Sequence, residues 1–143
     1  MIDSRDEWSP LQEIIVGSAT NANWPSDDPV FSTEHERTSW LETPVPSGPV
    51  PQWIVDEANN ELDILANTLT NYGAIVHRPD PMDFVSRHGM YNYCPRDRLL
   101  VAGSTIIDCN MMYPCRNQEI ESLQRFIDSA DCIIKMPRDQ GLV

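Results

Sequence analysis

Two short segments of this chain share the same order of elements, and this repeat constrains the fold more than any other sequence feature. YGAIVHRPD (72–80) and ADCIIKMPRD (130–139) each follow a helical pattern, continue as an apolar run typical of a strand, and contain a proline after it. Two earlier apolar runs, EIIVG (13–17) and RLLVAG (98–103), also resemble each other. The sequence therefore predicts two copies of a strand–helix–strand unit. Repeats of this size indicate modules that stack against further copies of themselves.

The spacing of apolar residues predicts the other elements. A helix with one apolar face is expected to end at Gly73, because apolar residues recur before it at intervals of three and four. Those residues are Ile54, Ala58, Leu62, Leu65, Leu69 and Tyr72. Two apolar runs, 98–101 and 105–107, flank Gly103 and predict a β-hairpin. A second, shorter helix is expected from Ile120 to Ile127. Residues 18–51 contain six prolines and no clear periodicity, so we expect a long loop there.

The charge of the chain limits its partners. Its 143 residues carry a formal net charge of −12, which argues against nucleic acid and anionic membranes as partners. No apolar run approaches the roughly 18–20 residues that a membrane-spanning helix needs. The opening residues, MIDSRDEW, are polar and acidic, unlike a secretory signal. We therefore expect one domain in the cytoplasm.

Asp97 is the residue whose position most needs an explanation. It lies in GMYNYCPRDRLLVAGSTIID (89–108), directly before an apolar run, where loops gather at strand ends to form sites. Its two oxygens suit parallel hydrogen bonds from a planar guanidinium, so guanidinium binding is one interpretation. The alternative is that Asp97 is a turn residue, or that it pairs with Arg96 or Arg98.

Two further charged residues are candidate helpers of Asp97. Asp108 stands at the end of the paired strand and would share the guanidinium contact. Arg116, in MMYPCRNQE, is a candidate substrate clamp, and its alternative role is a surface salt bridge.

The cysteines offer weaker candidates. Cys94, Cys109, Cys115 and Cys132 form no C-x-x-C pair, so we expect free thiols and neither zinc nor iron–sulfur ligation. A nearby cation lowers a thiol pKa, and arginines lie near Cys94 and Cys115 in sequence. Neither cysteine has a further signature of a nucleophile.

Four segments together resemble the N-terminal part of the glycine amidinotransferase family. They are DEWSPLQEIIVGSATNANWP (6–25), VDEANNELDILANTL (55–69), GAIVHRPD (73–80) and YNYCPRDRLLVAGSTIID (91–108). The resemblance covers residues 6–137, and its last segment is the most specific. Asp108 departs from the family, where glutamate is expected. NMMYPCR (110–116) replaces a Trp-containing stretch, which suggests a subgroup with a different amine acceptor.

This resemblance implies a fold and a domain organisation. The family has the pentein fold, an α/β propeller of five ββαβ modules around a central active site. Residues 1–143 would be the N-terminal part of that domain, a partial propeller of about two modules. Module one would cover about residues 6–80 and module two about residues 91–137. Such a chain is a fragment, a truncated gene product or one part of a split protein, and a homo-oligomer is also possible.

The resemblance also implies an activity. Family enzymes move an amidino group from arginine to an amine acceptor through an active-site cysteine, release ornithine, and use no metal or organic cofactor. Asp97 matches the aspartate of the P-R-D motif that holds the arginine guanidinium. The catalytic cysteine, histidine and second aspartate match no position here, so we expect the chain alone to be inactive. A deiminase-type hydrolase of the same fold and a non-catalytic guanidinium-binding module are the alternatives.

Overall fold

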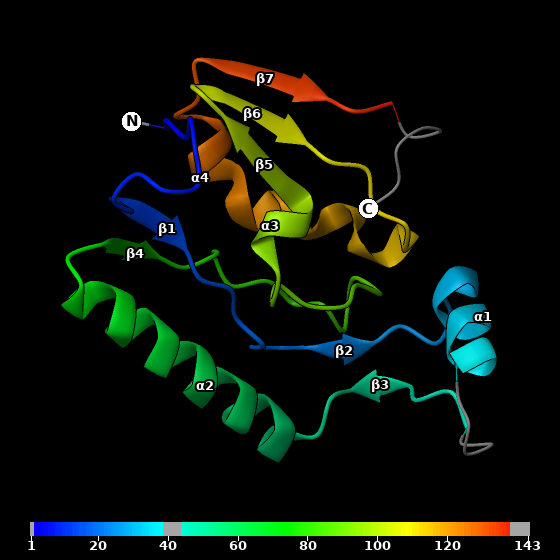
Figure 1. Cartoon of the computed structure of the whole chain (residues 1–143). Helices are drawn as coiled ribbons and strands as arrows, with labels where there is room; N and C mark the ends of the chain where they lie inside the picture. The colour runs from blue at the N-terminus through cyan, green and yellow to red at the C-terminus, as the bar shows by residue number, and fades with distance from the viewer. Residues whose placement is uncertain (1, 39–43, 138–143) are drawn as a thin grey trace.

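In the computed structural model, residues 2–38 and 44–137 are described, and they form three small sheets with helices beside them (Figure 1). The first sheet pairs β1 (Glu13–Ile15) in parallel with β4 (Ile75–His77), and the long connection between the two strands ends with α2 (Gln52–Asn71). Ile14 lies opposite Val76 in this register. A helical crossover between parallel strands is the connection that such pairing requires. The architecture is α/β, as the sequence predicts.

Helix α2 forms where its apolar spacing predicts it. Val55 and Leu62 are its buried residues, and Val55 packs with Ala19 and Ala22 in one of the hydrophobic clusters. After the helix, Gly73 adopts a φ of +94°, which glycine reaches without the steric cost of a Cβ atom. The predicted end of this helix is therefore confirmed.

The second half of the chain, which contains the elements that follow β4, has a three-stranded sheet of order β5–β6–β7. β5 (Leu99–Ala102) and β6 (Thr105–Asp108) form the predicted hairpin around Gly103, whose φ is +60°. β7 (Cys132–Lys135) pairs with β6 in parallel. The core of this half contains Leu99 and Ile106 from the sheet, with Leu123 and Ile127 from the helical segment.

The second helical segment differs from the sequence prediction in type and length. It begins earlier, as the 3₁₀-helix η1 (Pro114–Leu123), and continues as one turn of α-helix, α4 (Gln124–Ile127). The 3₁₀ geometry places residues i and i+3 directly above one another. This alignment matters for Arg116 and Glu119, described below.

The strand topology corrects one detail of the predicted repeat. β1 and β4 are parallel and joined by a helix, and so are β6 and β7. The strand equivalent to β1 is therefore β6, whereas the sequence comparison matched EIIVG with the β5 segment. β5 has no paired counterpart beside β1 among residues 2–38 and 44–137.

The expectation of a long loop over residues 18–51 is wrong for much of its described part. β2 (Asn23–Trp24) and β3 (Gly48–Pro49) form an antiparallel pair, and α1 (Pro29–Thr38) lies between them in the chain. Asp28 Oδ1 accepts the backbone N–H of Val30 at 2.9 Å and of Phe31 at 3.1 Å, as an N-terminal helix cap. Residues 39–43, also within that expected loop, lie outside the described residues.

The two halves meet along residues 17–24 and 89–93. The Ser18 backbone N–H donates to the Asn92 carbonyl at 2.9 Å, and the Asn23 N–H donates to the Met90 carbonyl at 2.8 Å. A Cβ atom on Gly17 would lie 1.9 Å from the Tyr93 carbonyl oxygen, so only glycine permits this approach. Within the described part of the chain, no helix combines the length and apolar character needed to cross a membrane.

Candidate functional site

Asp97 lies on α3 (Pro95–Arg98), a single helical turn that leads directly into β5. Its side chain is 28% exposed, and its Oδ2 accepts a hydrogen bond from Arg116 Nη1 at 3.1 Å. Its Oδ1 lies 3.8 Å from Nε of the exposed Arg96, beyond hydrogen-bond distance. Among the described residues, no hydrogen bond reaches Oδ1. One oxygen of the carboxylate, Oδ2, thus accepts a hydrogen bond from Arg116, and the other, Oδ1, accepts none from the described residues.

Arg116 is held inside the protein rather than presented at its surface. Its side chain is 7% exposed, and that of Glu119 is 1% exposed. Arg116 Nε and Nη2 donate to the two carboxylate oxygens of Glu119 at 2.8 and 2.9 Å. Its guanidinium also lies 5.2 Å from the centre of the Tyr91 ring, within cation–π range. The surface salt bridge considered from the sequence is therefore wrong for this residue.

The buried pair has opposing electrostatic terms. Burial raises the pKa of the Glu119 carboxyl to about 7, while the Arg116 guanidinium acts in the opposite direction. Burial also disfavours the charge on Arg116, but the hydrogen bonds and charge of Glu119 hold the pKa of Arg116 above its ordinary value. Arg116 is therefore a charged donor to Asp97.

Asp108 and Arg98 form a second internal pair. Arg98 Nη2 lies 2.7 Å from Asp108 Oδ1, with side chains 7% and 13% exposed. Arg98 Nη1 also donates to the Cys109 carbonyl. Asp108 thus pairs with Arg98, whereas Asp97 accepts its hydrogen bond from Arg116.

The two cysteines with arginines nearby do not have activated thiols. Burial, and then the negative charge of Asp97, raises the pKa of Cys94. Burial, together with hydrogen bonding to Asp28, raises the pKa of Cys115 well above its ordinary range. Because the thiolate is the nucleophilic form, both shifts oppose nucleophilic catalysis by these residues.

Metal-ligating side chains are also dispersed. Over residues 2–38 and 44–137, no group of three or more histidine, cysteine, aspartate or glutamate side chains is arranged to hold a metal ion. His77 lies in β4, where its Nε2 is 2.9 Å from Glu13 Oε2 on the neighbouring strand, so it has a structural partner.

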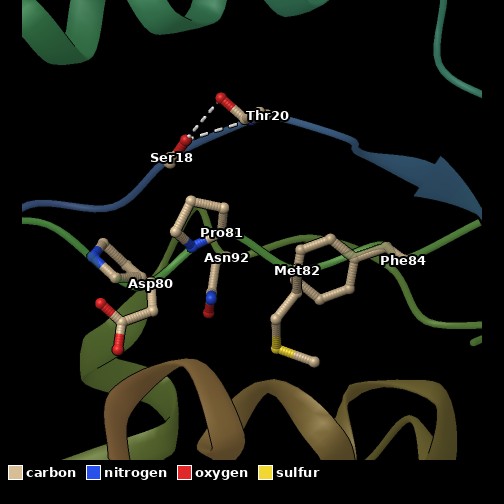
Figure 2. Close-up of a pocket in the computed structure, with 8 residues that line it drawn as sticks. Ser18, Thr20, Asp80, Pro81, Met82, Phe84 and Asn92 are labelled. Atoms are coloured by element: carbon tan, nitrogen blue, oxygen red, sulfur yellow. Dashed lines mark hydrogen bonds between the residues drawn. The ribbon is translucent and has the colours of Figure 1, made fainter. Parts of the chain in front are cut away.

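Two hollows lie near the site. A groove of about 260 Å³ has mainly apolar walls, which include Trp24, Tyr93 and the same Tyr91 that stacks on Arg116. The other hollow is a cavity of about 60 Å³ between the two halves (Figure 2). Its lining residues include Ser18, Thr20, Asp80, Pro81, Met82, Phe84 and Asn92.

Hydrogen bonds link a residue that lines the smaller cavity to the residues around Asp97. Asn92 is 3% exposed, and its amide nitrogen donates to Ser122 Oγ. Ser122 Oγ in turn donates to the Glu119 carbonyl at 2.7 Å. A continuous set of contacts therefore runs from the cavity wall to Glu119, and from there through Arg116 to Asp97.

Sequence reasoning found Asp97 and Arg116 but missed Glu119 and Tyr91. The available signal for Glu119 was its spacing of three residues from Arg116 in a helical segment, which brings opposite charges together. Tyr91 carried no comparable signal, because its contact with Arg116 joins segments 25 residues apart. Taken together, the site offers one open carboxylate edge to a planar cation.

No family model matches the sequence. The chain is 37% identical over 132 residues to inosamine-phosphate amidinotransferase 1 of Streptomyces griseus, covering 86% of this chain and 38% of that protein. It is 35% identical over 137 residues to mitochondrial glycine amidinotransferase of Gallus gallus, covering 87% of this chain and 32% of that protein. The chain therefore spans less than two fifths of the length of these curated relatives.

Solved structures agree with the sequence comparison. Inosamine-phosphate amidinotransferase StrB1 of Streptomyces griseus superposes with a TM-score of 0.77 at 32% identity, over 96% of this chain and 43% of that chain. The N-terminal domain of ArgZ, an arginine dihydrolase of cyanobacteria, superposes with a TM-score of 0.54 at 13% identity, over 91% of this chain and 41% of that chain. At that identity, ArgZ shares the fold alone.

The fold is thus that of the pentein-fold enzymes represented by these structures. Within that class, the resemblance to the glycine amidinotransferase family is confirmed, and the chain is homologous to part of these amidinotransferases.

Proposed function

We propose that the protein containing this chain transfers an amidino group from arginine to an amine acceptor, and that Asp97 anchors the guanidinium of arginine. The observation that carries this proposal is the geometry of Asp97. Its Oδ2 is held by Arg116 at 3.1 Å, and its Oδ1 has no hydrogen bond among the described residues. A fixed carboxylate with one open edge is suited to a charge-assisted hydrogen bond from a planar cation.

The reaction follows the course implied by the family resemblance. A cysteine thiolate attacks the guanidinium carbon, the bond from that carbon to the ornithine nitrogen breaks, and ornithine leaves after that nitrogen gains a proton. The acceptor amine then attacks the amidino-thioether carbon and loses a proton, and the thiolate is released. We assign the nucleophile, a histidine and a second aspartate to parts of the protein outside residues 1–143. The raised pKa values of Cys94 and Cys115 support this assignment.

The proposal extends to the domain organisation. Residues 6–80 and 91–137 would be the first two of five propeller modules, and the β5–β6–helix–β7 order of the second half has the ββαβ form. A cytoplasmic location is also part of the proposal.

The substrates are proposed to be arginine and an amine other than glycine. The departure of NMMYPCR (110–116) from the family pattern supports a different acceptor, because Arg116 at its end contacts Asp97. Inosamine-phosphate amidinotransferases are among the relatives, so an inosamine phosphate is one acceptor to test.

The test is to incubate the protein, as its gene encodes it, with arginine labelled in the guanidino carbon and a set of amines. The expected result is ornithine together with label in the amine. Citrulline and ammonia would instead assign a hydrolase. Arginine binding without any product would assign a non-catalytic binding module.

A further inference from the structure

Asn92 carries a buried hydrogen-bond acceptor that needs a donor. The residue is 3% exposed, and its Oδ1 is buried without a hydrogen-bond partner among the described residues. An amide oxygen has two lone pairs, and burying it without a hydrogen bond destabilises the folded state. Buried polar atoms of this kind are normally bonded either to protein or to ordered water.

The bonds around Ser122 fix which end of the Asn92 amide lacks a partner. The Ser122 hydroxyl has one hydrogen, and it donates that hydrogen to the Glu119 carbonyl at 2.7 Å. Its oxygen can therefore only accept from Asn92, and the amide nitrogen of Asn92 donates to it. Turning the amide over would place Oδ1 against an oxygen that has no hydrogen left to give. The donor to Oδ1 must come from elsewhere.

The small cavity between the two halves provides the space for such a donor. Asn92 and Asp80 both line this cavity of about 60 Å³, and the Asp80 backbone N–H donates to the Ser122 carbonyl at 2.8 Å. Figure 2 shows the polar ends of Asp80 and Asn92 on one side of the cavity view and the hydroxyls of Ser18 and Thr20 on the other. Because one water takes up about 30 Å³ in the liquid, the cavity has room for one or two.

We propose that this cavity is a water-binding site, in which one ordered water molecule donates a hydrogen to Asn92 Oδ1 and its other hydrogen to the carboxylate of Asp80. An amide oxygen and an ionised carboxylate accept hydrogen bonds but donate none, so the bound molecule must supply two donors. Asp80 has acceptor capacity for it, because Arg125 Nη1 lies 3.4 Å from Asp80 Oδ1, longer than an ordinary hydrogen bond.

The bound water would complete a set of hydrogen bonds at the boundary of the halves. The backbone carbonyl of Asn92 accepts the Ser18 N–H of the first half at 2.9 Å, and its side chain donates to Ser122 of the second half. The water would hold the remaining polar atom of the same side chain. This site is separate from the guanidinium contact proposed for Asp97 and does not depend on it.

The first experiment is a high-resolution crystal structure of the protein as its gene encodes it, grown without ammonium salts. The expected result is a solvent peak about 2.5–3.0 Å from Asn92 Oδ1, the ordinary O–H···O distance, and within the same distance of an Asp80 oxygen. A cavity without solvent density, or an Asn92 Oδ1 bonded to a protein donor, would overturn the proposal. A peak that contacts Asn92 but not Asp80 would overturn the two-acceptor arrangement.

Two variants test whether Asn92 holds the water. Asn92→Leu keeps the number of side-chain atoms and removes the acceptor, so its crystal structure is expected to lack the solvent peak. Thr20→Val is the matched control, because Thr20 lines the same cavity but its hydroxyl bonds to Ser18 and Asn59. This control should retain the peak. A peak that persists in Asn92→Leu, or that disappears equally from both variants, would contradict the role of Asn92.

An ammonium ion also supplies several donors, and thermal unfolding distinguishes it from water. Tm of the parent protein and of Asn92→Leu is measured in ammonium chloride and in sodium chloride at equal concentration. The expected result is the same Tm in both salts. A higher Tm in ammonium chloride that is lost in Asn92→Leu would assign the site to ammonium and overturn the assignment to water.

Discussion

Each half of the chain contains its own pair of parallel strands, and the two halves differ in the residues that are buried between those strands in sequence. In the first half, the connection from β1 to β4 contains β2, α1, β3 and the 20-residue helix α2, whose two buried residues, Val55 and Leu62, are apolar. In the second half, β6 and β7 are joined by η1 and α4, and the buried residues of η1 include Arg116, Glu119 and Ser122. The crossover of the three-stranded sheet at the top of Figure 1 thus contains buried charged residues, whereas the buried residues of α2 are apolar.

This difference shows how a repeated unit becomes specialised. A long amphipathic helix is stabilised mainly by its apolar stripe and tolerates change on its outer face. A short 3₁₀ segment with a buried ion pair places polar groups accurately but depends on every partner being present. The predictions below test this contrast.

The largest expected effect is the complete absence of turnover in the isolated chain of residues 1–143. Asp97 in the second half is the proposed guanidinium anchor, and the raised thiol pKa values of Cys94 and Cys115 oppose nucleophilic attack by either residue. Incubation with arginine and hydroxylamine, followed by quantification of ornithine, checks this. Catalytic release of ornithine would show that the site in these two halves is sufficient.

The next effect concerns ion pairs in the two halves. Glu119→Ala should lower the free energy of unfolding by about 3–5 kcal/mol, because it leaves a buried guanidinium without its carboxylate. The corresponding change in the first half is Glu13→Ala, which removes the exposed partner of His77 between β1 and β4. Glu13→Ala should leave the urea midpoint unchanged within error. Equal losses in the two variants would contradict the contrast between the halves.

Asp97→Asn should separate function from stability. It keeps the shape of the side chain and removes the charge, so arginine loses a charge-assisted hydrogen bond worth about 2–5 kcal/mol. At roughly 1.4 kcal/mol per factor of ten, kcat/KM for arginine should fall at least tenfold in the active protein. Comparison of kcat/KM with Tm tests this. A lowered Tm with intact kinetics would assign Asp97 to structure alone.

The smallest effect concerns Asp28, which links the halves. Its Oδ2 accepts the Cys115 backbone N–H at 2.7 Å, and its Oδ1 caps α1. Burial raises the pKa of Asp28, but the hydrogen bonds from Cys115, Phe31 and Val30 outweigh burial and lower it below its ordinary value. A lowered pKa in the folded state gives stability that is present above the ordinary aspartate pKa and lost as the pH falls through the lowered value.

Asp28→Asn should therefore remove that acid-dependent loss and lower stability at neutral pH by about 1 kcal/mol, the usual scale of a helix cap. Urea unfolding of both proteins between neutral and acidic pH measures the difference. Parallel pH profiles for the variant and the parent protein would contradict it.

The local pattern of the sequence was sufficient for the elements that depend on neighbouring residues. The extent of α2, its end at Gly73 and the hairpin around Gly103 follow from apolar spacing and from the conformations that glycine permits. α1 was missed because its ten residues, PVFSTEHERT, show no apolar face, although Asp28 before Pro29 is a sequence signal for the start of a helix. The match of β1 to the β5 segment was wrong because similar apolar runs do not show which strand pairs with which.

The sequence by itself placed Asp97 in a P-R-D motif close to the start of a strand, and the family resemblance of that motif is the basis for the proposed guanidinium role. Only the tertiary structure decided which arginine pairs with it. Arg98 adjoins β5, whose register sets Leu99 opposite Asp108, so Arg98 reaches Asp108. Arg116 reaches Asp97 because η1 lies against α3, and Glu119 accepts two further hydrogen bonds from Arg116, from Nε and Nη2. Which charges pair depends on distance and burial in the folded chain, and neither quantity can be read from the spacing of these residues along the sequence.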